Sequence, residues 1–115
     1  RQEDIAAERV SLSSRHTLTF PELTIDGRSQ QAFQNGTALA LTRIEFNMLL
    51  FLASNPGVTL SKEDLFSAVW GRDSADTLKV VANTVSNLRR KLGGSQTYIR
   101  TVRGGYVFSA VSATA

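Results

Sequence analysis

The sequence predicts an α+β fold in which a small antiparallel β-meander precedes three helices and a C-terminal β-hairpin. Short apolar alternations separated by Asp-Gly and Asn-Gly turn pairs fill residues 16–41, a pattern typical of a meander. Two helix-start signatures follow, at Thr42 and Ser61. A long amphipathic stretch then ends at Gly93-Gly94, before two β-rich runs.

Length and composition predict one domain. The 115 residues suffice for one modest core, and the lack of cysteine excludes disulfides and thiolate metal sites. We expect a linker at residues 1–14, the domain at 15–112 and a tail at 113–115. No apolar run reaches the roughly 18 residues that span a bilayer, and the N-terminal residues lack a signal-peptide core. The chain should be soluble and cytoplasmic, and Arg1 in place of Met suggests a processed chain or a fragment.

Turn and capping residues delimit the meander and the first helix. Asp26-Gly27 and Asn35-Gly36 should form tight turns, because both dipeptides tolerate positive φ angles. Thr42 to Glu45 has the form of a capping box, so a helix should begin there. It continues through an almost wholly apolar stretch and should stop before Pro56-Gly57.

The remaining elements follow from similar signals. Ser61 to Asp64 repeats the cap signature, and the second helix should end at Gly71. A polar connector at 71–76 leads to the third helix, which Asp76 or Thr77 can cap. The last β-rich runs, 98–102 and 106–108, should form a hairpin.

Charge is distributed unevenly along the chain. Residues 1–76 hold all ten acids and seven of the thirteen bases, whereas residues 77–115 hold six bases and no acid. Such an unopposed basic surface favours a polyanion, either nucleic acid or an anionic membrane. The alternative is an ordinary solvated basic face.

Groups capable of catalysis are few. His16 is the sole histidine, and no particular Ser or Asp pairs with it. Glu63 and Asp64 lie at a helix start, where interaction with the helix dipole already accounts for them. No phosphate-binding glycine motif is present. We therefore expect no enzyme, no catalytic residue, no metal and no cofactor.

The third helix has two distinct faces at 100° per residue. An apolar stripe is formed by Leu78, Val81, Val85, Leu88 and Leu92. Arg89 lies at the edge of this stripe, about 40° from Val85. The outward face comprises Lys79, Val80, Asn83, Ser86, Asn87 and Arg90.

This outward face has no carboxylate and suits the base edges of a DNA major groove. Amides pair with adenine, Lys or Arg reach guanine or phosphate, and Val80 could touch a thymine methyl group. In the following hairpin, Arg100 and Arg103 lie on a β-ribbon, and an arginine at a ribbon tip suits a narrow minor groove. A solvated helix face and a plain turn arginine are the alternatives.

The meander, the three helices and the hairpin, in this order, are typical of a winged helix-turn-helix. Three segments carry a resemblance to a known family: LTRIEFNMLLFLASNPGVTLSKEDLFSAVWG, KVVANTVSNLRRKL and YIRTVRGGYVF. In this order and spacing they resemble the C-terminal DNA-binding domain of OmpR/PhoB-type response regulators, over about residues 18–109.

The resemblance implies roles for individual residues. The third helix would enter the major groove, with the base-reading residues Lys79, Val80, Asn83, Ser86 and Asn87. Phosphate contacts would come from Lys62, Trp70, Thr84, Arg89 and Arg90, although Trp70 could equally cap the core. The wing would reach the minor groove with Thr101 and Arg103. The connector would contact RNA polymerase through Arg72, Asp73 and Asp76.

The sequence departs from the family pattern in three ways. Ser86 and Asn87 stand where relatives often place arginines, so the base preference should differ. The wing reads RGGY where many relatives have one residue more. The receiver domain, normally N-terminal, is absent, so the chain is either an excised effector domain or a regulator that lacks a receiver.

The predicted function is sequence-specific binding of double-stranded DNA by a bacterial transcription regulator of a two-component phosphorelay, associated with the nucleoid when bound. A second copy on direct-repeat half-sites is the expected partner. The main alternative is a winged-helix interaction module that docks an acidic protein. A membrane patch is disfavoured, because the cations lie opposite the apolar stripe without an exposed aromatic face.

Overall fold

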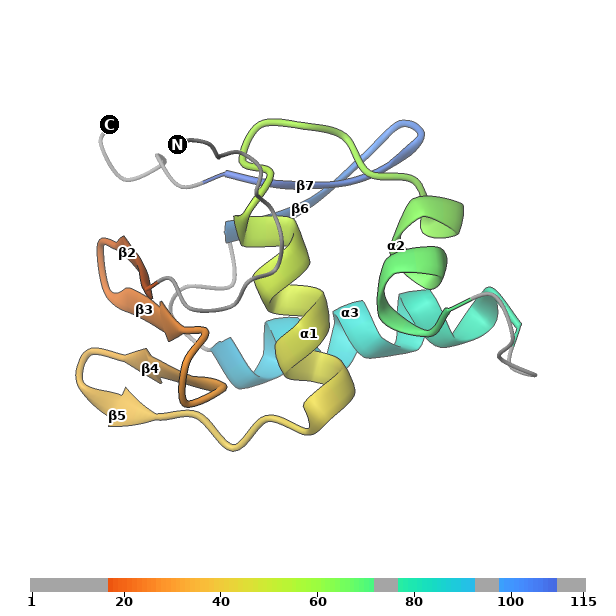
Figure 1. Ribbon diagram of the computed structural model, residues 1–115. Coiled ribbons are helices and arrows are strands. Elements are labelled where there is room, and N and C mark those ends of the chain that lie inside the picture. Colours follow the sequence, from red (N-terminus) through yellow and green to blue (C-terminus); the bar gives the residue numbers. More distant parts are fainter. Residues whose placement is uncertain (1–16, 72–76, 93–97, 110–115) are drawn as a thin grey trace, which may run out of the picture.

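The computed structural model describes residues 17–71, 77–92 and 98–109. In these ranges a four-stranded antiparallel sheet of order β2-β3-β4-β5 precedes three helices and a two-stranded hairpin (Figure 1). The strands of the sheet are β2 Thr17–Phe20, β3 Leu23–Asp26, β4 Gln31–Gln34 and β5 Thr37–Ala38. The helices and the hairpin are α1 Arg43–Ala53, α2 Lys62–Val69, α3 Lys79–Leu92, β6 Ile99–Val102 and β7 Gly105–Phe108. The expected α+β winged-helix class is confirmed.

The two glycine-containing turns of the meander differ. Asn35 and Gly36 both have positive φ, 53° and 83°, and join β4 to β5 in the tight turn expected from the sequence. The tight turn expected at Asp26-Gly27 is wrong, because β4 begins only at Gln31 and the positive φ of this loop, 58°, belongs to Gln30. The Asp26 carboxylate accepts a hydrogen bond from the amide of Arg28 at 2.9 Å. This bond gives a main-chain amide of the longer loop a local partner.

Both predicted capping boxes are present. Thr42 Oγ1 accepts from the amide of Glu45 at 3.1 Å, while the Glu45 carboxylate accepts from the amide of Thr42 at 2.9 Å. Ser61 and Asp64 repeat this reciprocal arrangement at 3.0 and 3.1 Å. Each box satisfies amides that the first helical turn leaves without partners, so α1 and α2 begin where the sequence predicts.

The third helix begins later than expected. It starts at Lys79, and the amides of Val80 and Val81 donate to the carbonyls three residues earlier, at 3.1 Å each. Leu78 lies in the turn before the helix and is 37% exposed, so its expected place in the apolar stripe is wrong. Thr77 Oγ1 accepts from the amide of Lys79 at 3.4 Å, and Asp76 lies outside the described residues.

The core gathers around α1, which packs against both α2 and α3 (Figure 1). Side chains from every layer contribute to one buried cluster. Its most completely buried members include Leu23, Ile25, Met48, Leu49, Leu52, Leu65, Val81, Val85, Leu88, Leu92, Ile99 and Phe108. Apart from Leu78, the buried face of α3 is therefore the one that its helical periodicity predicts.

An ion pair between half-buried Lys91 and buried Glu45 fixes the C-terminal end of α3 against the start of α1. Lys91 Nζ lies 2.6 Å from the Glu45 carboxylate and donates to the carbonyl of Ala40 at 3.0 Å. Burial raises the pKa of Glu45, but hydrogen bonds from Lys91 and the Thr42 amide outweigh burial and hold that pKa below its usual value. The contact orients α3 on the core.

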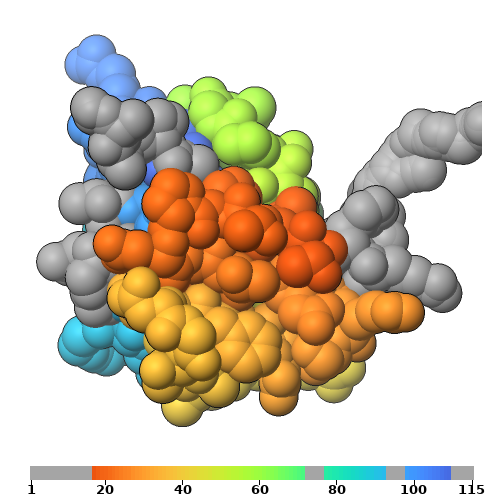
Figure 2. All heavy atoms as spheres, turned by 90° about the vertical axis from the view of Figure 1, so that its left-hand side faces the viewer, coloured from red at the N-terminus to blue at the C-terminus, as the bar shows by residue number. Residues whose placement is uncertain are grey.

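The four-stranded sheet forms one side of the molecule. Figure 2 shows strands β2 to β5 covering most of one face, with α3 visible only at its lower edge and the β6-β7 hairpin at its upper edge. This face therefore presents the sheet and little of α3 or of the hairpin.

Candidate nucleic-acid interface

The outward face of α3 presents polar and cationic side chains. Lys79, Asn83, Ser86 and Arg90 are exposed, and Val80 and Asn87 are half-buried. On the opposite face, Val81, Val85, Leu88 and Leu92 pack in the core. The helix contains no Asp or Glu. The structure therefore brings together the six side chains that the sequence placed on one face.

Two of these outward residues contact one another. Arg90 Nη2 donates a hydrogen bond to Oδ1 of Asn87, three residues earlier and one turn back along α3. The amide oxygen of Asn87 thus accepts a hydrogen bond from a cationic donor on the same face of α3.

Arg89 connects α3 to the hairpin. Its Nε donates to the carbonyl of Ile99 at 3.0 Å, and its Nη2 donates to Oγ1 of Thr101 at 2.7 Å. Its guanidinium carbon also lies 5.8 Å from the ring centroid of Tyr106, within cation–π range. The guanidinium expected at a phosphate is held by the wing, and its contact with phosphate stays a prediction.

Two further residues expected at phosphates are packed into the protein. Thr84 is only 9% exposed, on the buried side of α3. Trp70 is half-buried and stacks on Phe66, with ring centroids 5.6 Å apart and planes inclined by 10°. The packing of Trp70 against the core is the structural role that the sequence left open, whereas phosphate contacts from Thr84 and Trp70 stay predictions.

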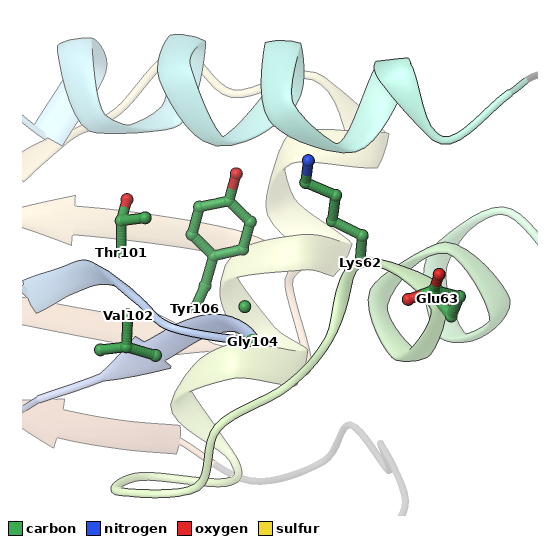
Figure 3. Close-up of a pocket in the computed structure, with 7 residues that line it drawn as sticks. Lys62, Glu63, Thr101, Val102, Gly104 and Tyr106 are labelled. Atoms are coloured by element: carbon green, nitrogen blue, oxygen red, sulfur yellow. The ribbon is translucent and has the colours of Figure 1, made fainter.

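A pocket of about 370 Å³ lies between the start of α2 and the wing. It is lined by Lys62, Glu63, Thr101, Val102, Gly104, Gly105 and Tyr106. Figure 3 shows the side chains of Lys62, Thr101 and Tyr106 pointing toward α3, while Val102 points the opposite way. An ammonium group and two hydroxyls thus share one side of the pocket. We call this group the Lys62–Thr101–Tyr106 notch.

The position of the notch depends on a main-chain contact that sequence patterns do not reveal. Leu60, just before α2, pairs with Tyr106 of β7 through two main-chain hydrogen bonds of 2.8 and 3.0 Å. Gly105 makes this approach possible, because a Cβ atom there would lie 2.1 Å from the carbonyl oxygen of Leu60. The sequence patterns do not single out Tyr106, although its pairing opposite Thr101 places it on the same side of the ribbon.

The wing tip is a two-residue loop. Val102 pairs with Gly105, which leaves Arg103 and Gly104 between the strands, and Gly104 has a φ of 94°. Arg103 is exposed at this tip, as its expected role requires. Arg100, on β6, is exposed and pairs opposite Val107, away from the notch.

Several sequence predictions fall outside the described residues. These are the linker at 1–14, His16, the tail at 113–115 and the expected polymerase-contact residues Arg72, Asp73 and Asp76. In the part of the chain that the structure describes, no helix combines the length and apolar composition needed to cross a membrane. The same residues contain no cluster of His, Asp and Glu side chains able to hold a metal ion.

Comparisons with known proteins agree with this architecture. Residues 36–108 match the family model described as "Transcriptional regulatory protein, C terminal". The transcriptional regulatory protein VxrB of Vibrio cholerae is 44% identical over 89 residues, which are 76% of this chain and 36% of VxrB. The chain therefore spans well under two thirds of that relative.

Solved structures show the same fold. The DNA-binding domain of CpxR from E. coli has a TM-score of 0.72 at 34% identity, covering 84% of this chain and 99% of that one. The Klebsiella pneumoniae RstA DNA-binding domain, solved in complex with the RstA box, has a TM-score of 0.73 at 33% identity, covering 82% and 97%. The chain thus belongs to the family of C-terminal domains of transcriptional regulatory proteins, the winged-helix effector domains of OmpR/PhoB-type response regulators.

Proposed function

We propose that the chain binds double-stranded DNA in a sequence-specific manner, as the effector domain of a bacterial two-component transcription regulator. The observation that carries this proposal is the outward face of α3, which exposes amides, a hydroxyl and cations without one carboxylate. A carboxylate there would repel a polyanion, whereas amides and cations suit base edges and phosphates. In this proposal α3 enters the major groove and Arg103 the minor groove.

The exposed residues divide into those that read bases and those that position the protein. Base reading is assigned to Lys79, Val80, Asn83, Ser86 and Asn87. Lys62 and Arg90 take phosphates, because both are exposed cations at the margins of this surface. Trp70, Thr84 and Arg89 are packed against the protein, and their phosphate contacts remain part of this proposal.

The Lys62–Thr101–Tyr106 notch suits one phosphate of the DNA backbone. The Lys62 ammonium supplies charge, and the two hydroxyls supply hydrogen-bond donors. Thr101 Oγ1 already accepts a hydrogen bond from Arg89, so its own proton is available for a phosphate oxygen. This geometry supports a positioning contact at the junction of α2 and the wing.

The wider assembly is part of the proposal. We place the binding domain at residues 15–112, with a second copy on a direct-repeat half-site and RNA polymerase at the connector 71–76. A receiver domain N-terminal to this one would control it in the full regulator. The setting would be the bacterial cytoplasm, at the nucleoid when the domain is bound. The domain acts by binding and not by catalysis.

A salt titration with a random duplex pool tests this function. Counterion release predicts that log K falls with log salt, with a slope of about −0.9 per phosphate contact. Lys62→Ala should weaken binding to all sequences and reduce the slope by about one contact. The matched control is Arg28→Ala, an exposed cation in a turn of the meander, which should leave the slope unchanged. Lack of binding, or a flat salt dependence, would overturn the proposal and favour an acidic protein partner.

A further inference from the structure

The pairing of Arg90 with Asn87 changes what the C-terminal half of α3 presents on its outward face. Resting on the proposed DNA binding, we propose that these two residues act together as a reader of guanine, which gives Arg90 a contact with a base in place of the phosphate contact assigned above. Asn87 alone carries both an acceptor and a donor, which is the pattern that pairs bidentately with adenine. The hydrogen bond from Arg90 engages one of the two lone pairs of this acceptor and places a cation beside it.

The contact is well suited to persist. The donor is a charged guanidinium, which makes a stronger hydrogen bond than a neutral group. Residues three apart on a helix are neighbours, and Asn87 is half-buried, which restricts its side chain. No carboxylate in α3 competes for the guanidinium of Arg90.

With one of the two lone pairs of Oδ1 engaged by a cationic donor, the pair presents mainly donors. These are the amino hydrogens of Asn87 and the remaining N–H groups of Arg90. Guanine presents two acceptors, O6 and N7, to the major groove and no donor. Adenine and cytosine each present an amino group there, which would meet other donors, and thymine offers one acceptor beside a methyl group. Guanine is therefore the base edge that complements the pair.

Asn83 provides an internal comparison. It lies on the same exposed face, four residues before Asn87 and one turn earlier. Its side chain has no hydrogen-bond partner among the described residues, so its oxygen and amino group are both available for adenine. The two asparagines should therefore prefer different bases although they share one face.

Selection from a random duplex library tests the pair, using the full chain and three α3 variants. Asn87→Ala and Asn83→Ala identify the base position that each asparagine reads. At the Asn87 position the unmodified chain should prefer guanine over adenine by roughly ten- to a hundredfold, the range of one good bidentate contact. Arg90→Met frees the amide oxygen, so the preference there should move to adenine, while the Asn83 position keeps adenine.

Arg28→Met is the charge-matched control, because it removes one exposed cation at a turn of the meander. It should alter neither base position. Adenine at the Asn87 position in the unmodified chain would overturn the inference, and so would a guanine preference that persists in Arg90→Met. If the unmodified chain enriches no sequence at all, the proposed DNA binding itself fails, and the pair fails with it.

Discussion

The guanidinium of Arg89 is bound to the wing, with its Nε donating to the carbonyl of Ile99 at 3.0 Å. A second hydrogen bond, to Thr101, means that one guanidinium contacts β6 at two points. This favours one orientation of β6 relative to α3. The position of the wing relative to the outward face of α3 therefore depends on a side chain that the sequence placed only at the edge of the apolar stripe.

Loss of this connection should lower stability. Arg89→Met removes the donor to the carbonyl of buried Ile99, and we expect the free energy of unfolding to fall by about 1–3 kcal/mol. Urea unfolding followed by circular dichroism measures the change. Arg100→Met is the control, since Arg100 is exposed on the same strand and should change stability by no more than about 0.5 kcal/mol. An equal fall in the free energy of unfolding of both variants would show that the hydrogen bond to Ile99 does not contribute to stability.

The Glu45–Lys91 ion pair should make stability depend on pH. Burial raises the pKa of Glu45, but the hydrogen bonds from Lys91 and the Thr42 amide lower it by more. The pKa of Glu45 in the folded protein therefore lies below the ordinary 4.5. A depressed carboxyl pKa contributes stability that is present above the unfolded value and is lost as pH falls through the folded value. Unfolding titrations between about pH 7 and about pH 3 should therefore show a steeper loss for the unmodified chain than for Glu45→Gln.

Lys91→Met separates this effect from general acid destabilisation. Without Lys91, burial of Glu45 is no longer offset by its main partner, and the acid-dependent loss should shrink toward that of Glu45→Gln. Identical pH profiles for the unmodified chain and both variants would contradict the role given to the pair.

Gly105 should tolerate no side chain. A Cβ atom there would meet the Leu60 carbonyl at 2.1 Å, so Gly105→Ala must break the main-chain pairing between Leu60 and Tyr106. We expect a loss of about 2 kcal/mol or more in thermal unfolding, as for other forced close contacts. Gly57→Ala is the comparison, because it also has positive φ but meets no atom within 4 Å, and should cost less. A smaller effect at Gly105 than at Gly57 would refute the close approach.

The hydroxyl of Tyr106 should contribute to DNA affinity but not to base preference. Tyr106→Phe keeps the buried ring and removes one donor of the notch, so affinity should fall by about fivefold for all duplexes, near 1 kcal/mol. Fluorescence anisotropy with several unrelated duplexes measures this. A loss confined to one sequence would mean that the notch reads bases and does not hold a phosphate.

Local signals predicted much of the fold, because each acts within a few residues. The capping boxes at Thr42 and Ser61 and the turn at Asn35-Gly36 lie where the sequence places them. Helical periodicity also separated the buried and outward faces of α3. These features depend on local hydrogen bonds and on a fixed angle per residue.

The sequence predictions fail where side-chain hydrogen bonds within a loop, or contacts between distant segments, determine the local structure. The Asp26 carboxylate stabilises a four-residue loop that replaces the expected tight turn, and Leu78 falls in a turn before α3. The notch exists only because Leu60 pairs with Tyr106, a long-range contact without a sequence signature. The Arg89 contact with Ile99 is of the same kind, since periodicity gives an angle around the helix and not the neighbour on another element.

The most direct test of the central claim is to place one carboxylate on the outward face of α3. Ser86→Glu adds a negative charge at an exposed position of that face, and Thr37→Glu adds the same group on β5 of the sheet. We measure affinity for a duplex selected by the unmodified chain, at about 0.1 M salt. The account predicts a loss of at least about tenfold for Ser86→Glu, near 1.4 kcal/mol, with little change for Thr37→Glu. Equal affinities for the two variants would contradict the claim that this face meets DNA.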